Sequence, residues 1–310
     1  MYFSDFSGQD STKTQLLDLF KSDRVLIGGD STESGQAAVK ALSDIYSKWI
    51  SKSKILTTNV WSSELSKLAS NAMLAQRVSS INSLSALCEK TGADINEIAM
   101  AVGMDHRIGP HFLRASVGFG GSCFQKDILN LVYICKSLEI NEVADYWEQV
   151  IIMNNHQRTR FAKNILTSLY NNVAGKKITI LGWSFKKDTN DTRESAAIYV
   201  ADNLIDEEAS IHVYDPKVSA KQMHLDLNNL NSREKSLNIR MLNVEESPYD
   251  ASKNSHAIAI LTEWDEFKGY DWEKIYASMN KPAFIFDGRN ILDKTKLEKI
   301  GFIYKAIGKQ

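Results

Sequence analysis

The segment SVGFGGSCFQKD occupies Ser116–Asp127 and joins a glycine-rich turn to the start of a helix. Its three glycines can adopt backbone angles closed to other residues, so they predict a tight turn whose amides approach a ligand closely. Ser122 is a residue type typical of a helix N-cap, and apolar residues recur at helical spacing from Cys123 to Glu139. The segment therefore predicts a turn followed directly by a helix.

Cys123 falls in the first turn of this predicted helix. Free backbone amides and the positive end of the helix dipole favour a thiolate there, and Lys126 adds positive charge one turn on. Asp127 supplies a carboxylate that could hold a water or a cation. A lone cysteine beside an aromatic residue is more often a small buried hydrophobe, so placement alone leaves both the nucleophile and the core interpretation open.

The composition is that of an ordinary globular protein. The chain has 310 residues, 43% hydrophobic and 24% charged, which is enough for about two domains. A net charge of −1 gives no electrostatic reason to expect nucleic acid or an anionic membrane as a partner. The three cysteines show no CxxC spacing, which argues against a disulfide framework or a zinc site. With no secretory signal in residues 1–12 and no apolar run long enough to span a bilayer, we expect a cytoplasmic protein.

The first sixty residues have the pattern of part of an α/β domain. We predict a short helix over Lys13–Phe20, a longer helix over Glu33–Ile50, and strands over Arg24–Ile27 and Lys54–Thr57. Two strands with a helical crossover are too few for a sheet of their own. We therefore expect residues 1–60 to be the remnant of a larger parallel α/β domain.

The middle of the chain, residues 61–155, is predicted to be all helical. Its long helices run from Asn59 or Ser62 to about Lys90 and from about Asn141 to Asn171, with a short helix over Asp94–Val102 between them. Lys67 and Asn71 share one face of the first helix. An exposed Glu–Lys pair with an incidental asparagine is the ordinary interpretation of that face.

Residues 156–310 alternate strand and helix. The predicted strands are Lys177–Leu181, Ile211–Tyr214, Ala257–Leu261, Ala283–Phe286 and Phe302–Tyr304, with helices from Arg193 or Glu194 to Asp206 and over Trp272–Ser278. Residues Ser219–Glu246 are too polar to assign. This alternation predicts a doubly wound, mostly parallel sheet.

Two loops of this sheet carry cations where ligands bind, at the carboxyl ends of strands. They are Lys186, Lys187 and Arg193 after the first strand and Arg289 after a later one. Such cations suit a pyrophosphate, although each on its own could be a solvated loop charge. The first loop has Gly182 but no GxGxxG, so it predicts a nucleotide held by side chains rather than a dinucleotide on a glycine turn.

Several stretches together resemble the UDP-glucose 6-dehydrogenase branch of the UDP-glucose/GDP-mannose dehydrogenase family, and most closely its animal members. They are GFGGSCFQKD at Gly118–Asp127, WSSELSKLASNAMLAQR at Trp61–Arg77, GMDHRIG at Gly103–Gly109, LGWSFKKDTNDTRES at Leu181–Ser195, LTEWDEF at Leu261–Phe267 and IFDGRN at Ile285–Asn290. The resemblance implies an α/β protein. In it, an all-helical central region with long connecting helices is followed by a doubly wound, Rossmann-like C-terminal domain.

The resemblance also implies a reaction. The family oxidises the C6 alcohol of UDP-glucose to UDP-glucuronate with two NAD, through an aldehyde, a thiohemiacetal and a thioester. Cys123 would then be the nucleophile that attacks the aldehyde. Lys67 and Asn71 would steady the developing oxyanion, and Asp127 would position or activate the hydrolytic water.

Ligand contacts follow from the same resemblance. UDP-glucose would contact Lys67, Leu68, Ala69, Ser70, Asn71, Arg114, Ala115, Ser116, Val117, Gly118, Phe119, Gly120, Phe185, Lys186 and Arg289. NAD would contact Cys123, Phe124, Gln125, Lys126 and Arg193. Arg107 would reach the substrate of a neighbouring subunit, which implies a homo-oligomer of two or more chains. Arg114 stands where the family commonly has lysine.

The sequence also departs from the family pattern. Members begin with a Rossmann domain whose GxGxVG turn holds NAD and later carry a Phe-Leu-x-Glu-Gly segment, and neither motif occurs in this sequence. The resemblance therefore implies that residues 1–60 are a remnant of the N-terminal NAD-binding domain, and we expect its main part to be absent and the chain alone to have little or no turnover. Two alternatives are a non-catalytic module that binds UDP-sugars or joins full-length subunits, and a dehydrogenase of another nucleotide sugar such as GDP-mannose.

Overall fold

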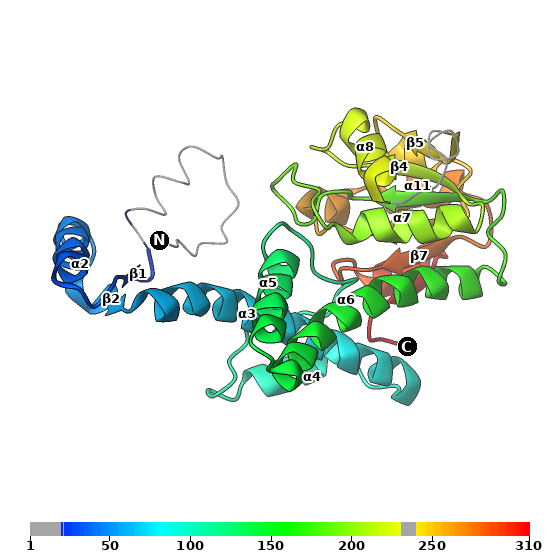
Figure 1. Cartoon of the computed structure of the whole chain (residues 1–310). Helices are drawn as coiled ribbons and strands as arrows, with labels where there is room; N and C mark the ends of the chain where they lie inside the picture. The colour runs from blue at the N-terminus through cyan, green and yellow to red at the C-terminus, as the bar shows by residue number, and fades with distance from the viewer. Residues whose placement is uncertain (1–19, 21, 231–239) are drawn as a thin grey trace. The chain divides into compact units, whose positions relative to one another are not determined.

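The computed structural model describes residue 20, residues 22–230 and residues 240–310 (Figure 1). The chain divides into two compact units, Met1–Met73 and Leu74–Gln310. Helix α3 (Val60–Thr91) begins in the first unit and ends in the second. The helix predicted over Lys13–Phe20 lies outside the described residues except for Phe20, and the division into residues 1–60, 61–155 and 156–310 stays a prediction.

The first unit contains a parallel pair of strands joined by a helix. Strand β1 (Val25–Gly28) pairs with β2 (Ile55–Thr58) in the register that sets Val25 opposite Ile55, and α2 (Glu33–Tyr46) connects them. A short 3₁₀ turn, η1 (Lys52–Lys54), precedes β2. A small apolar core unites these elements, formed by Val25, Ile27, Val39, Tyr46 and Ile50.

Helices fill the first part of the second unit. The remainder of α3 is followed by α4 (Ile95–Gly103), α5 (Phe124–Ser137) and α6 (Asn141–Ser168). Helices α5 and α6 lie side by side, and α6 continues along the sheet (Figure 1). The helical prediction for this region is confirmed.

The rest of the second unit is one parallel sheet with helices on both faces. The six strands run in the order β5 (Leu242–Val244), β4 (Ser210–Tyr214), β3 (Lys177–Leu181), β6 (Ala257–Ile260), β7 (Phe284–Asp287) and β8 (Ile303–Ala306). Every neighbouring pair is parallel. Because the chain order reverses between β3 and β6, the predicted doubly wound sheet is confirmed.

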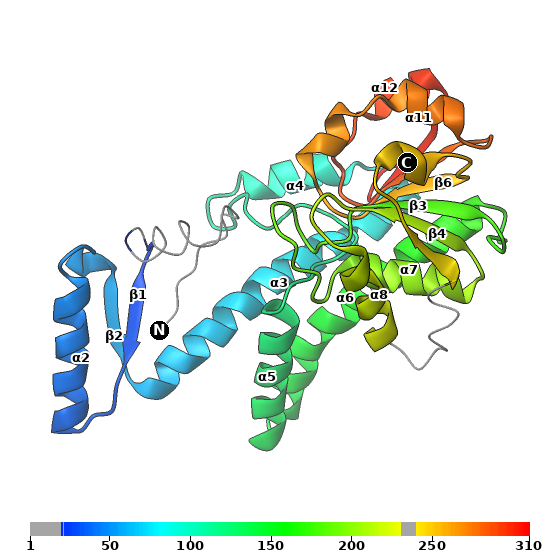
Figure 2. The same ribbon diagram turned by 90° about the horizontal axis from the view of Figure 1, so that it is seen from above.

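Alternate strand residues build two cores, one on each face. One core includes Ile178 and Ile180, which pack against α6, α7 (Ala196–Asp206) and α8 (Ala220–Leu230). The other includes Ile258, which packs against α11 (Trp272–Ser278) and α12 (Lys294–Ile300). Figure 2 shows α7 and α8 on one side of the sheet and α11 and α12 on the other. Strands buried on both faces explain the continuous apolar runs in the sequence.

Among the described residues, three α-helices and one strand were missed by the sequence prediction. Two of them, α8 and β5, lie in the polar stretch Ser219–Glu246, and the others are α10 (Pro248–Ser252) and α12. Only Met223 and Leu227 of α8 are buried, which leaves too weak an apolar period to detect. A further 3₁₀ turn, η2 (Asp265–Gly269), follows β6.

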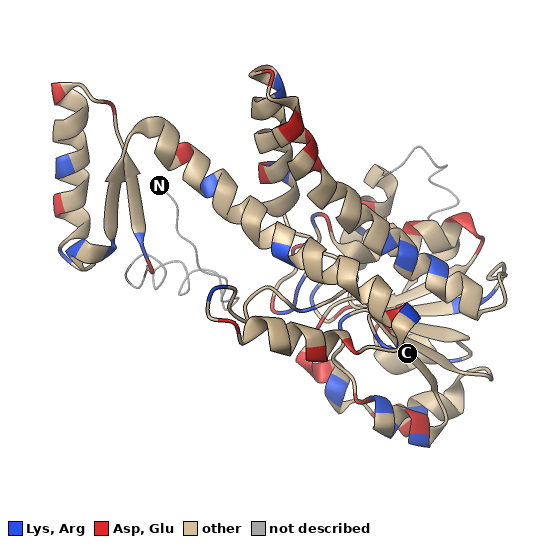
Figure 3. Cartoon of the chain, turned by 90° about the horizontal axis from the view of Figure 1, so that it is seen from below, with Lys and Arg blue, Asp and Glu red and all other residues tan. Residues whose placement is uncertain are grey.

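Charges are mixed over both units. Figure 3 shows basic and acidic positions interspersed along the described elements. Within the described part of the chain, no helix is long and apolar enough to cross a membrane.

We predict that Ile180→Ala destabilises the second unit by about 2–5 kcal/mol, because it removes a fully buried side chain from the central strand and leaves a cavity. The matched control is Ile303→Ala on the edge strand β8, where the side chain is 41% exposed and the expected loss is about 1 kcal/mol or less. Denaturant unfolding followed by circular dichroism measures both. Equal losses at the two positions would contradict the assignment of the core.

Candidate active site

Cys123 lies at the solvent-exposed start of α5. Its thiol is free and exposed, whereas Cys88 and Cys135 are buried, so the core interpretation of Cys123 is wrong. The prediction that Ser122 is the N-cap is also wrong. The helix begins one residue later, at Phe124, and Cys123 is the N-cap residue, whose carbonyl accepts from the Asp127 amide at 2.8 Å.

The turn before Cys123 has a backbone that requires glycine. Gly118 and Gly121 have φ of 123° and 88°, the left-handed region that other residues rarely adopt. At Gly120 a Cβ atom would lie 2.5 Å from the Glu194 carbonyl oxygen. The Gly121 amide donates to the Arg193 carbonyl at 2.8 Å. The glycines therefore let this turn pack directly on the loop that follows β3.

Three buried polar residues of α6 hold the same turn. Asn154 forms a pair of hydrogen bonds with Phe119, accepting from its amide at 2.9 Å and donating to its carbonyl at 3.1 Å. Gln157 donates to the Ser116 carbonyl at 2.8 Å. Arg158 donates to the Phe119 carbonyl at 2.7 Å. These bonds satisfy backbone groups that burial would otherwise leave unpaired.

Arg158 is the largest of the three and is only 1% exposed. The same nitrogen, Nη2, also donates to the Glu194 carbonyl at 2.8 Å, and the guanidinium lies 4.1 Å from the centre of the Tyr199 ring. Burial lowers the pKa of Arg158, and the nearby Tyr199 and Glu194 oppose that effect. Tyr199 donates to the Glu194 carboxylate at 2.6 Å, and burial together with this bond raises its pKa to about 12.

Asn154, Gln157 and Arg158 were not predicted from the sequence as site residues. Their separations of three and four residues place them on the same stripe as the apolar Phe161 and Ile165. The sequence signal for these residues was their polar character at positions of α6 where the helical period predicts burial.

A buried carboxylate shapes the loop after β3. The Asp215 Oδ2 atom accepts from the backbone amides of Trp183 and Ser184, at 2.7 and 3.0 Å, and from the Trp264 indole at 3.1 Å. The next two residues, Phe185 and Lys186, are half-buried. Asp215 therefore fixes the loop just before two of the predicted substrate contacts.

Arg289, which follows β7, is also held by several hydrogen bonds. Its amide donates to Asp287 at 3.0 Å, its Nε donates to the Leu261 carbonyl at 2.7 Å, and its Nη2 donates to the Phe185 carbonyl at 3.2 Å. Glu263 lies 3.4 Å from the same guanidinium. The structure thus brings Arg289 and Phe185 together, as predicted from the carboxyl ends of their strands.

The other cations of the β3 loop differ in their partners. Lys187 pairs with Asp265, and Arg193 pairs with Asp191 at 2.7 Å. Hydrogen bonds to Asp191 raise the pKa of Arg193. Lys186 lies 5.6 Å from the centre of the Phe185 ring and, among the described residues, forms no ion pair.

Arg107 and Arg114 are both exposed. Arg107 forms three hydrogen bonds to the Asp105 carboxylate, from its amide and its Nε at 3.0 Å each and from its Nη2 at 2.6 Å. Arg114 donates to the Asn290 carbonyl at 3.4 Å. The contact of Arg107 with a second subunit stays a prediction.

The remaining predicted residues of the long helix belong to the first unit. Lys67, Leu68, Ala69, Ser70 and Asn71 lie on α3, and only Leu68 among them is buried. Both Lys67 and Asn71 have interaction partners. Their approach to Cys123 stays a prediction.

The start of α5 offers two further polar groups. Asp127 is buried and has an interaction partner. The Gln125 Oε1 atom is buried but accepts no hydrogen bond from any described residue. An unpaired buried acceptor fits a ligand that carries an amide donor. Among the described residues no group of three or more His, Cys, Asp or Glu could hold a metal ion.

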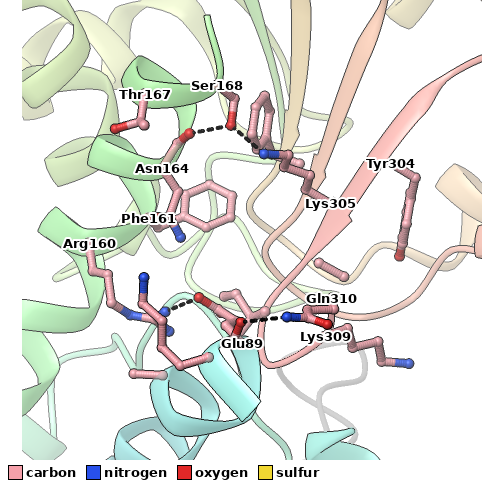
Figure 4. A pocket seen from close by; sticks show the side chains of 15 residues that line it. Glu89, Arg160, Phe161, Asn164, Thr167, Ser168, Tyr304, Lys305, Lys309 and Gln310 are labelled. Atoms are coloured by element: carbon pink, nitrogen blue, oxygen red, sulfur yellow. Dashed lines mark hydrogen bonds and ion pairs between the residues drawn. The ribbon is translucent and has the colours of Figure 1, made fainter. Parts of the chain in front are cut away.

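A separate cavity of about 520 Å³ contains none of the predicted site residues. Figure 4 shows Arg160 and Phe161 of α6, Glu89 of α3 and Lys305 of β8 around it. Arg160 pairs with Glu89, and Lys305 donates to the Ser168 hydroxyl at 2.8 Å.

Two family profiles match the chain. One is described as the central domain of the UDP-glucose/GDP-mannose dehydrogenase family and matches residues 61–156. The other is described as the UDP binding domain of the same family and matches residues 179–294.

Known proteins agree with these profiles. The chain is 58% identical to the UDP-glucose 6-dehydrogenase of Mus musculus and 57% identical to that of Drosophila melanogaster, over 96% of its own length in each case. It spans about 60% of the length of the relatives it matches. A solved UDP-glucose dehydrogenase from Pyrobaculum islandicum superposes with a TM-score of 0.78 at 29% identity, covering 95% of this chain and 61% of that one.

We predict that iodoacetamide adds one group to the native chain, at Cys123, because Cys88 and Cys135 are buried. Intact-mass spectrometry should show one adduct under native conditions and three after unfolding in guanidinium. Cys123→Ser should show none under native conditions. A native chain that takes up several groups at similar rates would contradict the burial of the other two thiols.

We also predict that Gly120→Ala destabilises the turn, because the new Cβ would lie 2.5 Å from the Glu194 carbonyl oxygen. The expected decrease in the free energy of unfolding is about 1–3 kcal/mol, the usual cost of overpacking a protein core. Gly269→Ala is the control, since a Cβ there meets no atom within 4 Å. Thermal unfolding measures both, and equal stability of Gly120→Ala and the native chain would rule out the close packing described.

Proposed function

Because the chain belongs to the UDP-glucose/GDP-mannose dehydrogenase family, we propose that it supplies the cysteine and the UDP-binding part of a UDP-glucose 6-dehydrogenase. The reaction proposed is the NAD-dependent oxidation of UDP-glucose to UDP-glucuronate. The observation that carries this proposal is the exposed Cys123 at the start of α5, on a turn packed against the Phe185–Arg193 loop.

Cys123 is suited to covalent chemistry on an aldehyde. Its thiolate would add to the C6 carbonyl carbon to give a thiohemiacetal, and loss of hydride from that carbon would give a thioester. Water would then cleave the carbon–sulfur bond, releasing the carboxylate and regenerating the thiol. Buried Asp127, one turn along α5, is proposed to position or activate that water.

The loops at the carboxyl ends of β3 and β7 are suited to UDP. Lys186 forms no ion pair with any described residue, so its charge is available for a pyrophosphate oxygen. Arg289 ties Phe185 to the β7 loop through the Phe185 carbonyl. We propose that Phe185, Lys186 and Arg289 hold the nucleotide while the segment from Arg114 to Gly120 contacts the sugar.

NAD, when bound, accepts the hydride in each of the two oxidations. The residues of this chain that would hold it are Cys123, Phe124, Gln125, Lys126 and Arg193. The unpaired Gln125 Oε1 fits the amide donor of a nicotinamide, and Lys126 is exposed. Arg193 is exposed, and its carbonyl accepts from the amide of Gly121, two residues before Cys123.

Two further roles are proposed from the family. Lys67 and Asn71, four residues apart on one face of α3, would stabilise the oxyanion at C6. Residues Leu68, Ala69 and Ser70 between them would contact the substrate. Arg107, which is 78% exposed and bonded to Asp105, would extend to the substrate of a second subunit in a homo-oligomer.

Calorimetry and cysteine labelling test this function together. We expect UDP-glucose to bind and to slow alkylation of Cys123, and Lys186→Ala to weaken binding by roughly tenfold or more because a charged hydrogen bond is lost. GDP-mannose is the comparison ligand, and tighter binding of GDP-mannose would favour a dehydrogenase of another nucleotide sugar. Binding of UDP-glucose without any protection of Cys123 would favour a non-catalytic UDP-sugar module.

A further inference from the structure

We propose that Arg158 is a positioning residue, which sets the Cys123 turn against the nucleotide loop so that a bound UDP-sugar presents its C6 carbon to the sulfur. The inference rests on the function proposed above. Arg158 makes hydrogen bonds to the backbone of both segments and is not itself placed in contact with substrate.

The inference rests on two hydrogen bonds donated by one nitrogen of Arg158. Arg158 Nη2 donates to the Phe119 carbonyl at 2.7 Å and to the Glu194 carbonyl at 2.8 Å. Phe119 lies four residues before Cys123, and Glu194 directly follows Arg193. A single rigid guanidinium therefore fixes the separation of the two segments.

The surroundings of Arg158 restrict its movement. Its side chain is 2% exposed, and the Tyr199 ring lies 4.1 Å from the guanidinium carbon. The Glu194 carboxylate is 3.8 Å from Nη1 and accepts from the Tyr199 hydroxyl. Because a buried cation is costly to leave without acceptors, these partners keep the guanidinium in one place.

The two segments also touch each other where Arg158 holds them. The Gly121 amide bonds to the Arg193 carbonyl, and a Cβ atom built on Gly121 would lie 3.0 Å from the Phe185 ring. A small shift of either segment would therefore move Phe185 and Lys186 relative to Cys123. Displacements of about 1 Å are enough to reduce a positioned reaction roughly 100-fold.

The test measures how strongly saturating UDP-glucose protects Cys123 from iodoacetamide, in the full 310-residue chain. Saturation removes any effect of changed affinity. The variants are Arg158→Gln and Tyr199→Phe. The second variant keeps the aromatic ring next to the Arg158 guanidinium but removes the hydroxyl that donates to the Glu194 carboxylate. Lys163→Gln is the control, an exposed cation five residues along α6 from Arg158. Thermal unfolding establishes a temperature at which every variant is folded.

We expect protection of Cys123 to fall by roughly tenfold or more in Arg158→Gln and by a smaller factor in Tyr199→Phe, with Lys163→Gln like the native chain. A purely structural role would lower the unfolding temperature without changing protection in the folded protein. Should Arg158→Gln fail to fold, a loss of protection in Tyr199→Phe alone supports the inference and native protection in that variant overturns it. If folded Arg158→Gln keeps native protection, Arg158 is not a positioning residue. If the native chain is not protected at all, the proposed function itself fails and this inference with it.

Discussion

A guanidinium buried between a helix and two loops is the contact on which the candidate site depends. Arg158 comes from α6, one of its acceptors belongs to the glycine turn and the other to the loop after β3. A buried charge is costly to leave without acceptors, so the hydrogen bonds from Arg158 to these two carbonyls stabilise the guanidinium in its buried position. The arginine therefore requires both carbonyls to be present, and the two loops are fixed relative to each other.

The glycine turn also packs closely against the loop after β3. Its close approach to Glu194 leaves no room for a Cβ at Gly120, and its approach to the Phe185 ring leaves only a tight space at Gly121. The chain then leaves the contact and starts α5, with Cys123 outside the packed region and its sulfur exposed. A rigid base and an accessible nucleophile are what covalent catalysis on a bound sugar requires.

The sequence predicted the architecture of the second unit well because its strands are buried on both faces. Strand β3 and helix α11 have the predicted bounds, since continuous apolar runs or strong helical periods mark them. Helix α8 and strand β5 escaped prediction because each buries few side chains at the edge of the sheet.

The candidate site was predictable only in part. Glycines, a cysteine and loop cations carry their chemistry in the residue type, and family resemblance assigned roles to them. The roles of Asn154, Arg158 and Asp215 cannot be read from their residue types, because these side chains act by hydrogen bonding to backbone groups 31 to 39 residues away in the sequence. A polar residue on a helix or at a strand end is usually solvated, and only the folded structure shows that these are buried.

Amide hydrogen exchange of the turn tests the central claim most directly. The amides of Val117, Phe119 and Gly121 donate to Gly288, Asn154 and Arg193, all within 2.9 Å. We expect these three amides to exchange as slowly as those of strand β3, because they open only when the packed unit opens. Exchange as fast as that of an exposed loop residue such as Asn190 would contradict it.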